Sequence, residues 1–110
     1  MGADLTKAVL VRVNLRDANL SDAKLTGANL AEANLADAYL IGTQLSGASM
    51  KGANLSTANL TRANLTGADL TDADLTRANF TRATLDGADL TGATLCRTTM
   101  PDGRVDNSGC

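Results

Sequence analysis

The chain contains 110 residues, 44% of them hydrophobic and only 2% aromatic, and it carries a formal net charge of −2 with no histidine. This length supports one domain with a narrow aliphatic core. The weak negative charge and the scarcity of aromatic side chains argue against nucleic-acid binding, and no stretch reaches the ~20 apolar residues that would cross a membrane. Histidine, a glycine-rich phosphate loop and a nucleophile elbow are all absent, so we expect neither an enzyme nor a bound cofactor.

From Leu5 to Met100, every fifth residue is large and apolar, and the residue two places before it is small. Leucine fills seventeen of the twenty large positions, and alanine fills seventeen of the twenty small ones. The exceptions are Met50, Phe80 and Met100 among the large positions, and Val13, Thr43 and Thr98 among the small ones. The chain therefore consists of twenty five-residue repeats, and we call each repeat a word.

The five-residue period excludes both a regular α-helix and a flat β-strand. On an α-helix five residues advance about 500°, so the leucines would spread around every side. On a flat strand the odd spacing would place Leu15 and Leu20 on opposite faces. A short extended segment followed by a corner restores the alternation in each word. The pattern thus predicts a backbone that coils around its own leucines and alanines.

Glycine marks a recurring corner at Gly27, Gly47, Gly67 and Gly87, which are spaced twenty residues apart. Because glycine accommodates the positive φ of a type II turn, the column indicates matching corners in successive coils. Four words then make one coil, and twenty words make about five coils with a length of about 24 Å at the spacing of paired strands. We predict an all-β fold, a quadrilateral parallel β-helix.

The words ANLTG, ADLTD and ANLAE resemble the pentapeptide repeat family, whose word is alanine, then aspartate or asparagine, then leucine and two variable residues. The resemblance covers nearly all of residues 3–102 and implies a right-handed quadrilateral β-helix. It does not imply an enzyme. The ending LCRTTMPDGRVDNSGC is similar to that of many cyanobacterial members.

The repeats are expected to span residues 1–102, with a C-terminal tail at 103–110. Cys96 and Cys110 enclose a Pro-Asp-Gly turn signal, and a disulfide between them would fold the tail over the last leucine layer. Two free thiols are the alternative, and a zinc site would lack ligands. If the disulfide forms and a leader was removed, the periplasm or the thylakoid lumen is favoured, and otherwise the cytoplasm.

Asparagine or aspartate precedes the large residue in twelve of the twenty words. These side chains hydrogen-bond nearby backbone groups and tolerate corner geometry, so we interpret them as supports of the coil.

One face departs from this monotony. Arginines occupy the corner before it and the corner after it, and two apolar or aromatic side chains lie outward near its N-terminal half. An arginine cluster suits carboxylate or phosphate groups, and an exposed tyrosine is a credible contact. The candidate interaction face comprises Arg62, Arg77, Arg82, Arg97, Tyr39 and Ile41, with Asp17, Asp22 and Asp37 at its acidic N-terminal end.

Three functions follow from these patterns. The first hypothesis is a non-enzymatic structural or protein-interaction module whose partner is unknown. The second rests on the family resemblance, which includes bacterial members that mimic DNA and bind DNA gyrase; the nearly balanced charge of this chain fits that role poorly. The third is an ice-binding solenoid with threonine ladders, such as Thr61 with Thr81, which the arginine corners interrupt.

The first coil has an unpaired backbone edge, and such edges invite association. We therefore expect either a homodimer formed through the N-terminal coil or a monomer with frayed first words.

Overall fold

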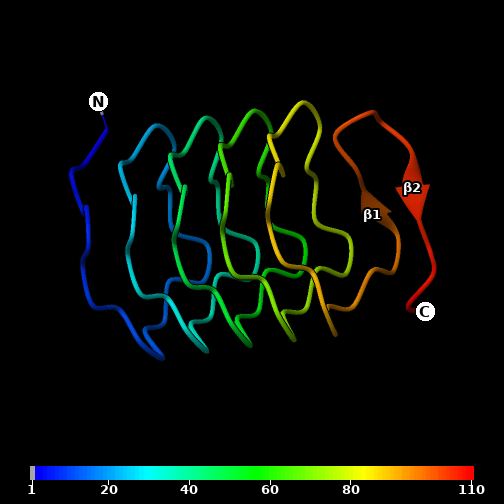
Figure 1. Ribbon diagram of the computed structural model, residues 1–110, viewed down its shortest axis with the longest axis horizontal. Helices are drawn as coiled ribbons and strands as arrows, with labels where there is room; N and C mark the ends of the chain where they lie inside the picture. The colour runs from blue at the N-terminus through cyan, green and yellow to red at the C-terminus, as the bar shows by residue number, and fades with distance from the viewer. Residues whose placement is uncertain (1) are drawn as a thin grey trace.

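The computed structural model describes residues 2–110, in which the backbone winds into successive coils stacked along one axis (Figure 1). Parallel β-bridges join residues twenty apart along the whole stack, from Asp4 with Lys24 to Asn79 with Thr99. Four five-residue words therefore complete one turn. The longest dimension is 33 Å, and the two shorter ones are 26 and 23 Å.

Each word makes the same backbone hydrogen bonds. The Leu5 amide donates to the Lys24 carbonyl at 2.7 Å, and the Lys24 amide donates to the Ala3 carbonyl at 2.8 Å. A further bond within the word, from Ala8 to the Leu5 carbonyl at 3.0 Å, closes the corner. The coils are thus joined at every side, although each extended segment is too short to form a regular strand.

At every corner from residue 7 to residue 97, the second residue lies in the left-handed region of φ. Gly27, Gly47 and Gly67 adopt φ of 66 to 67°, which suits glycine, but Arg77 adopts φ of 60° as well. Among residues 2–110, twelve corner positions with positive φ are not glycine. A left-handed conformation costs such residues about 1–2 kcal/mol each, so other interactions must hold the corners.

The side chain that precedes each large residue supplies one of these interactions. Asn54 accepts a hydrogen bond through Oδ1 from the Ser56 amide at 3.0 Å, which forms an Asx turn at the corner. All twelve asparagines and aspartates at this position make the same contact, at 2.9 to 3.1 Å. Their role as supports of the coil is confirmed.

Within residues 2–110, the large and small positions of the words form the interior. From Leu25 to Phe80 every large side chain is fully buried, and the alanines between them are equally enclosed. At the N-terminal end, Leu5, Leu10, Leu15 and Leu20 are only partly buried, and Val9 is 78% exposed. The core is therefore driest in the middle coils, where each layer has a neighbour on both sides.

Two threonines replace alanine inside the stack, and both are fully buried. The Thr43 hydroxyl donates to the Leu20 carbonyl at 2.9 Å, and the Thr98 hydroxyl donates to the Leu75 carbonyl at 2.7 Å. Each buried hydroxyl thus has a partner in the preceding coil, as a dry core requires.

The C-terminal tail folds back on the stack. Strand β1 (Thr98–Thr99) pairs antiparallel with strand β2 (Val105–Asp106), and the Gly109 amide donates to the Leu95 carbonyl at 2.8 Å (Figure 1). The tail covers only part of the last layer, because Leu85 and Leu90 remain partly exposed.

No helix within residues 2–110 has the length and apolar character of a membrane span.

Shortening a leucine should destabilise the middle of the stack far more than its end. Leu55→Ala removes a fully buried side chain between two layers, and we expect a loss of about 2–5 kcal/mol in the free energy of unfolding. Leu5→Ala, at a half-buried position with one neighbouring layer, should cost much less. Urea titration followed by circular dichroism measures both, with Leu55→Met as a volume-conserving control. Equal losses at Leu55 and Leu5 would contradict a core whose stability depends on stacking.

Candidate functional site

The candidate site lies on the outer corner that follows the third word of each coil. We call it the groove corner, because the groove described below lies on it; its residues are 16–17, 36–37, 56–57, 76–77 and 96–97. The next corner along the chain, which we call the Arg62 corner, consists of residues 21–22, 41–42, 61–62, 81–82 and 101–102. One face of the coil separates them.

A groove of about 520 Å³ occupies the C-terminal half of the groove corner. It is lined by Ser56, Thr57, Thr76, Arg77, Cys96, Arg97 and Cys110. The narrow core predicted no wide pocket, and the groove indeed lies outside the core, on the corner and beneath the tail. It exists because three successive coils and the end of the chain meet there.

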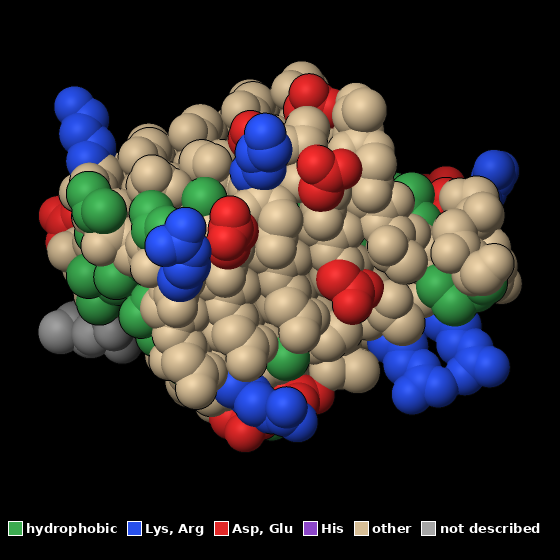
Figure 2. All heavy atoms as spheres, turned by 90° about the horizontal axis from the view of Figure 1, so that it is seen from below, with side chains coloured by type: hydrophobic (Ala, Val, Ile, Leu, Met, Phe, Trp, Pro, Cys, Tyr) green, Lys and Arg blue, Asp and Glu red, His purple; other side chains and the backbone are tan. Residues whose placement is uncertain are grey.

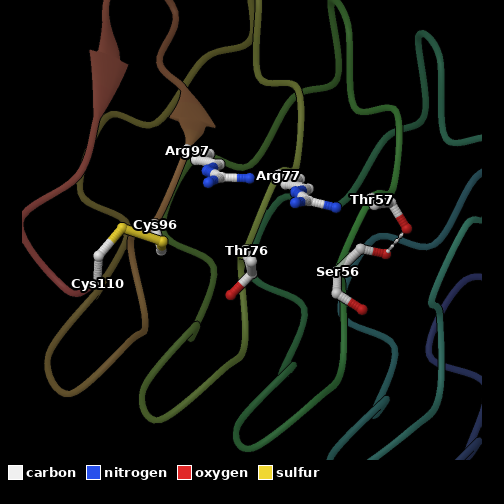
Figure 3. A pocket seen from close by; sticks show the side chains of 7 residues that line it. All are labelled: Ser56, Thr57, Thr76, Arg77, Cys96, Arg97 and Cys110. Carbon is white, nitrogen blue, oxygen red and sulfur yellow. Dashed lines mark hydrogen bonds between the residues drawn. A yellow bond between two sulfur atoms is a disulfide. The ribbon is translucent and has the colours of Figure 1, made fainter.

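The groove is organised by two arginines in consecutive coils. Figure 3 shows the cystine at one end and Thr57 at the other, with Arg97 and Arg77 between them and both side chains directed toward Thr57. Both residues are exposed and have left-handed backbones, with φ of 60° at Arg77 and 54° at Arg97. The corner geometry therefore aligns the two guanidinium groups along the groove.

Within the described residues, 2–110, no acidic side chain compensates the positive charge in the groove. Among residues 2–110, no carboxylate oxygen lies within 4.0 Å of a side-chain nitrogen of Arg77 or Arg97. In Figure 2, basic side chains project at the lower right, toward the C-terminal end, without acidic neighbours, whereas at the lower centre basic and acidic side chains lie together. Like charges held in adjacent coils repel one another unless an anion joins them.

The N-terminal end of the same corner is arranged differently. Arg16 forms a 3.2 Å ion pair with Asp37 and a 4.0 Å pair with Asp17. The Thr57 hydroxyl donates to Asp37 Oδ1. The sequence pattern indicated an acidic end here, but Arg16 neutralises part of it. The corner consequently changes from mixed charge to purely basic charge along the axis.

A disulfide between Cys96 and Cys110 closes the C-terminal end of the groove. The Arg97 amide also donates to Asn107 Oδ1 at 2.8 Å, which fixes the tail beside the arginine. Cys110 lines the groove only because this bond returns the end of the tail to the corner. The disulfide is therefore part of the groove wall as well as a clasp for the tail.

The other residues of the candidate face do not line the groove. Arg62 and Arg82 are exposed on the Arg62 corner, and Ile41 is half-buried on the same corner. Tyr39 is 52% exposed on the intervening face, where it is bridged to Asn59. Residue types alone did not single out Ser56, Thr57 or Thr76, which become recognisable only once the coils are superposed at twenty-residue intervals.

Aspartates that precede the large residue of a word accept hydrogen bonds from the backbone of their own corner. The pKa of Asp89 is lowered because its carboxylate accepts hydrogen bonds from the Thr91 hydroxyl at 2.6 Å and the Thr91 amide at 3.0 Å. Asp4 has a lowered pKa for the same reason, through Thr6. Hydrogen bonds of this kind stabilise the charged form and disfavour a role as a general acid. Residues 2–110 contain no group of three or more potential metal ligands.

A dry stack of leucine layers, a backbone joined at every side and four corners per turn define a four-sided β-solenoid. The family model for pentapeptide repeats matches residues 1–35, 18–56 and 58–97 with 8 copies. The chain belongs to the pentapeptide repeat family, as the resemblance of its words predicted. Members of this family form right-handed quadrilateral β-helices and are generally non-enzymatic structural or interaction modules.

Solved structures of this family are similar to the chain. Rfr23 from the cyanobacterium Cyanothece 51142 is 37% identical with a TM-score of 0.54, over 74% of this chain and 58% of that protein. A protein from the thylakoid lumen of Arabidopsis thaliana is 30% identical with a TM-score of 0.58, over 99% and 80%. QnrB1, a plasmid-mediated fluoroquinolone resistance protein, is 20% identical with a TM-score of 0.44, over 74% and 57%, and this likeness carries no functional argument. The comparison with curated protein sequences gave no match.

Removing the disulfide should loosen the tail. In the chain-entropy model a loop of this size contributes about 3 kcal/mol, so we expect Cys110→Ser to lower the free energy of unfolding by up to about this amount. Urea unfolding with and without reductant measures the effect. The reduced wild-type chain is the matched control and should behave like the variant. Identical curves for the oxidised wild-type chain and the variant would contradict a stabilising role.

Proposed function

We propose that the protein is a non-enzymatic protein-interaction module that binds an acidic partner through the basic half of its candidate face. The observation that carries this proposal is the pair of uncompensated arginines, Arg77 and Arg97, in an exposed groove. Planar guanidinium groups donate paired hydrogen bonds to carboxylates and phosphates, which makes arginine the preferred residue for such contacts. Arg62 and Arg82, on the neighbouring corner, extend the same positive potential.

The intervening face supplies a candidate apolar contact beside these charges. Tyr39 exposes 52% of its surface, and Ile41 lies half-buried at the adjacent corner. An exposed aromatic side chain with a polar tip contributes strongly to protein interfaces. A partner that reaches both regions would pair its acidic groups with the C-terminal arginines and its apolar groups with the N-terminal half of the face.

The same observations favour this role over the other two hypotheses. A DNA mimic requires a strongly acidic surface, whereas this face presents four arginines at its C-terminal half. In a threonine ladder that binds ice, the hydroxyls must face water. The hydroxyls of Thr61 and Thr81 instead donate to Asn59 and Asn79 within their own words.

We further propose that the protein works in an oxidising compartment, such as the periplasm or the thylakoid lumen. The support is the disulfide between Cys96 and Cys110 and the similarity to a thylakoid lumen protein over 99% of the chain. Disulfides persist in oxidising compartments and are rare in the cytosol.

Removal of positive charge at matched positions tests the interaction face. The test variant changes Arg62, Arg77, Arg82 and Arg97 to serine; the control variant changes Lys7, Arg12, Lys24 and Lys51 to serine. Each removes four positive charges and takes the net charge from −2 to −6, but the control residues lie on other corners and faces. Immobilised wild-type and control chains should retain the same proteins from a lysate of the source organism, and the test variant should lose them.

The elution of the retained proteins should also depend on salt, because exposed charge pairs are screened. Capture that is equal for the test and control variants would refute the proposed face. Capture lost equally in both would show that only the net charge matters, which would equally refute it.

A further inference from the structure

We propose that the groove between the cystine and Thr57 is a binding site for a phosphate dianion, either free or as a monoester. This inference deepens the proposed function, because it names the chemical group that the arginine groove recognises. It rests on charge, on the alignment of the two guanidinium groups and on the polar groups that surround them.

The charge of the groove matches a dianion. Arg77 and Arg97 contribute two positive charges from adjacent coils, which lie about 4.8 Å apart in paired β-structure, and neither has an acidic partner within residues 2–110. One carboxylate would neutralise only one of them. A phosphate monoester carries about −1.5 to −2 at neutral pH and offers three acceptor oxygens. It can therefore accept hydrogen bonds from both guanidinium groups at once.

The shape of the groove also favours a phosphate ester. Both arginine side chains run in the same direction along the groove, so their donors can converge on one anion (Figure 3). A volume of about 520 Å³ leaves room for the group that carries the phosphate and falls in the ordinary range of small-molecule sites.

Two of the three hydroxyl groups that line the groove already donate hydrogen bonds to carboxylates of the chain. The Thr76 hydroxyl already donates to Asp74 at 2.6 Å, and the Thr57 hydroxyl donates to Asp37. Within residues 2–110 the Ser56 hydroxyl has no such acceptor, so it remains available to a polar group of the ligand at the Thr57 end of the groove.

Asp37 lies just beyond Thr57 and is paired with Arg16, so the N-terminal end of the groove offers an anion no uncompensated positive charge. The phosphate therefore belongs at the arginines, and the neutral or cationic part of the ligand belongs toward Thr57 and Asp37. The shared chemistry fits two sources, a free phosphate ion and a phosphoserine in a partner protein, and separate probes distinguish them.

The experiment is a titration followed by the backbone amide signals of the full, oxidised chain. The probes are inorganic phosphate and three versions of one short peptide that differ only in carrying phosphoserine, glutamate or serine at the centre. The phosphoserine peptide should shift the signals of Ser56, Thr57, Thr76, Arg77 and Arg97. Its affinity should exceed that of the glutamate peptide by about tenfold, because the dianion engages both arginines. The serine peptide should not bind.

Two double variants locate the site. Arg77→Ser with Arg97→Ser should weaken phosphoserine binding by at least about tenfold. Lys7→Ser with Lys51→Ser removes the same charge from corners outside the candidate face and should change it by less than about threefold. All four positions are exposed, so both variants should fold, which thermal unfolding verifies.

The outcomes separate this inference from the proposed function. Inorganic phosphate binding as tightly as the phosphoserine peptide would support the site with a free anion as its ligand, and tighter peptide binding would support a phosphoprotein. Equal affinity for the glutamate and phosphoserine peptides, or equal loss in the two double variants, would overturn the phosphate site. Partner capture by the candidate face can survive that result. If the test and control variants capture partners equally while the phosphoserine peptide still binds the groove, the proposed function is refuted and the phosphate site is retained.

Discussion

The structure depends on the register between coils, which the five-residue word sets. An inward leucine, an inward alanine and a closed corner recur at a constant spacing, so backbone amides meet carbonyls of the adjacent coil or of their own corner. If one corner were a residue longer, the following leucines would point outward, because successive side chains in an extended segment alternate. The Asx contact supports ten of the twelve non-glycine corners with positive φ, all except those of Arg12 and Arg97. It offsets part of the cost of the left-handed backbone at residues such as Arg77.

Much of this fold could be predicted from the sequence, since the leucine spacing excludes helices and flat sheets and the glycine column gives the turn length. The sequence did not reveal that positive φ extends to arginine, aspartate and threonine at the corners. The reason is physical. Glycine indicates a left-handed conformation in a sequence because it adopts positive φ readily. Arg77 has no such preference and adopts this conformation because the neighbouring coils fix its backbone.

The candidate site was predictable only in part. The twenty-residue spacing of Arg77 and Arg97 followed from the sequence, and so did the existence of a basic half of the face. The groove did not follow, because it requires the tail to return to the corner, and local residue patterns do not specify that path. The ion pairs of Arg16 with Asp17 and Asp37 were missed as well. The pair with Asp37 depends on a rotamer that reaches one coil further along the axis, and the pair with Asp17 depends on the same side-chain conformation.

A solenoid of this kind separates stability from recognition. The inward positions contain almost only leucine and alanine, and buried leucines from Leu25 to Leu75 pack without any contribution from the corners. Substitutions on the corners therefore change the charge of the surface while the core stays the same. Because residues twenty apart become neighbours, two changes at that spacing create a paired site from chemically simple parts. The two groove arginines are such a pair, and their proximity reflects the pitch of the coil and requires no dedicated loop.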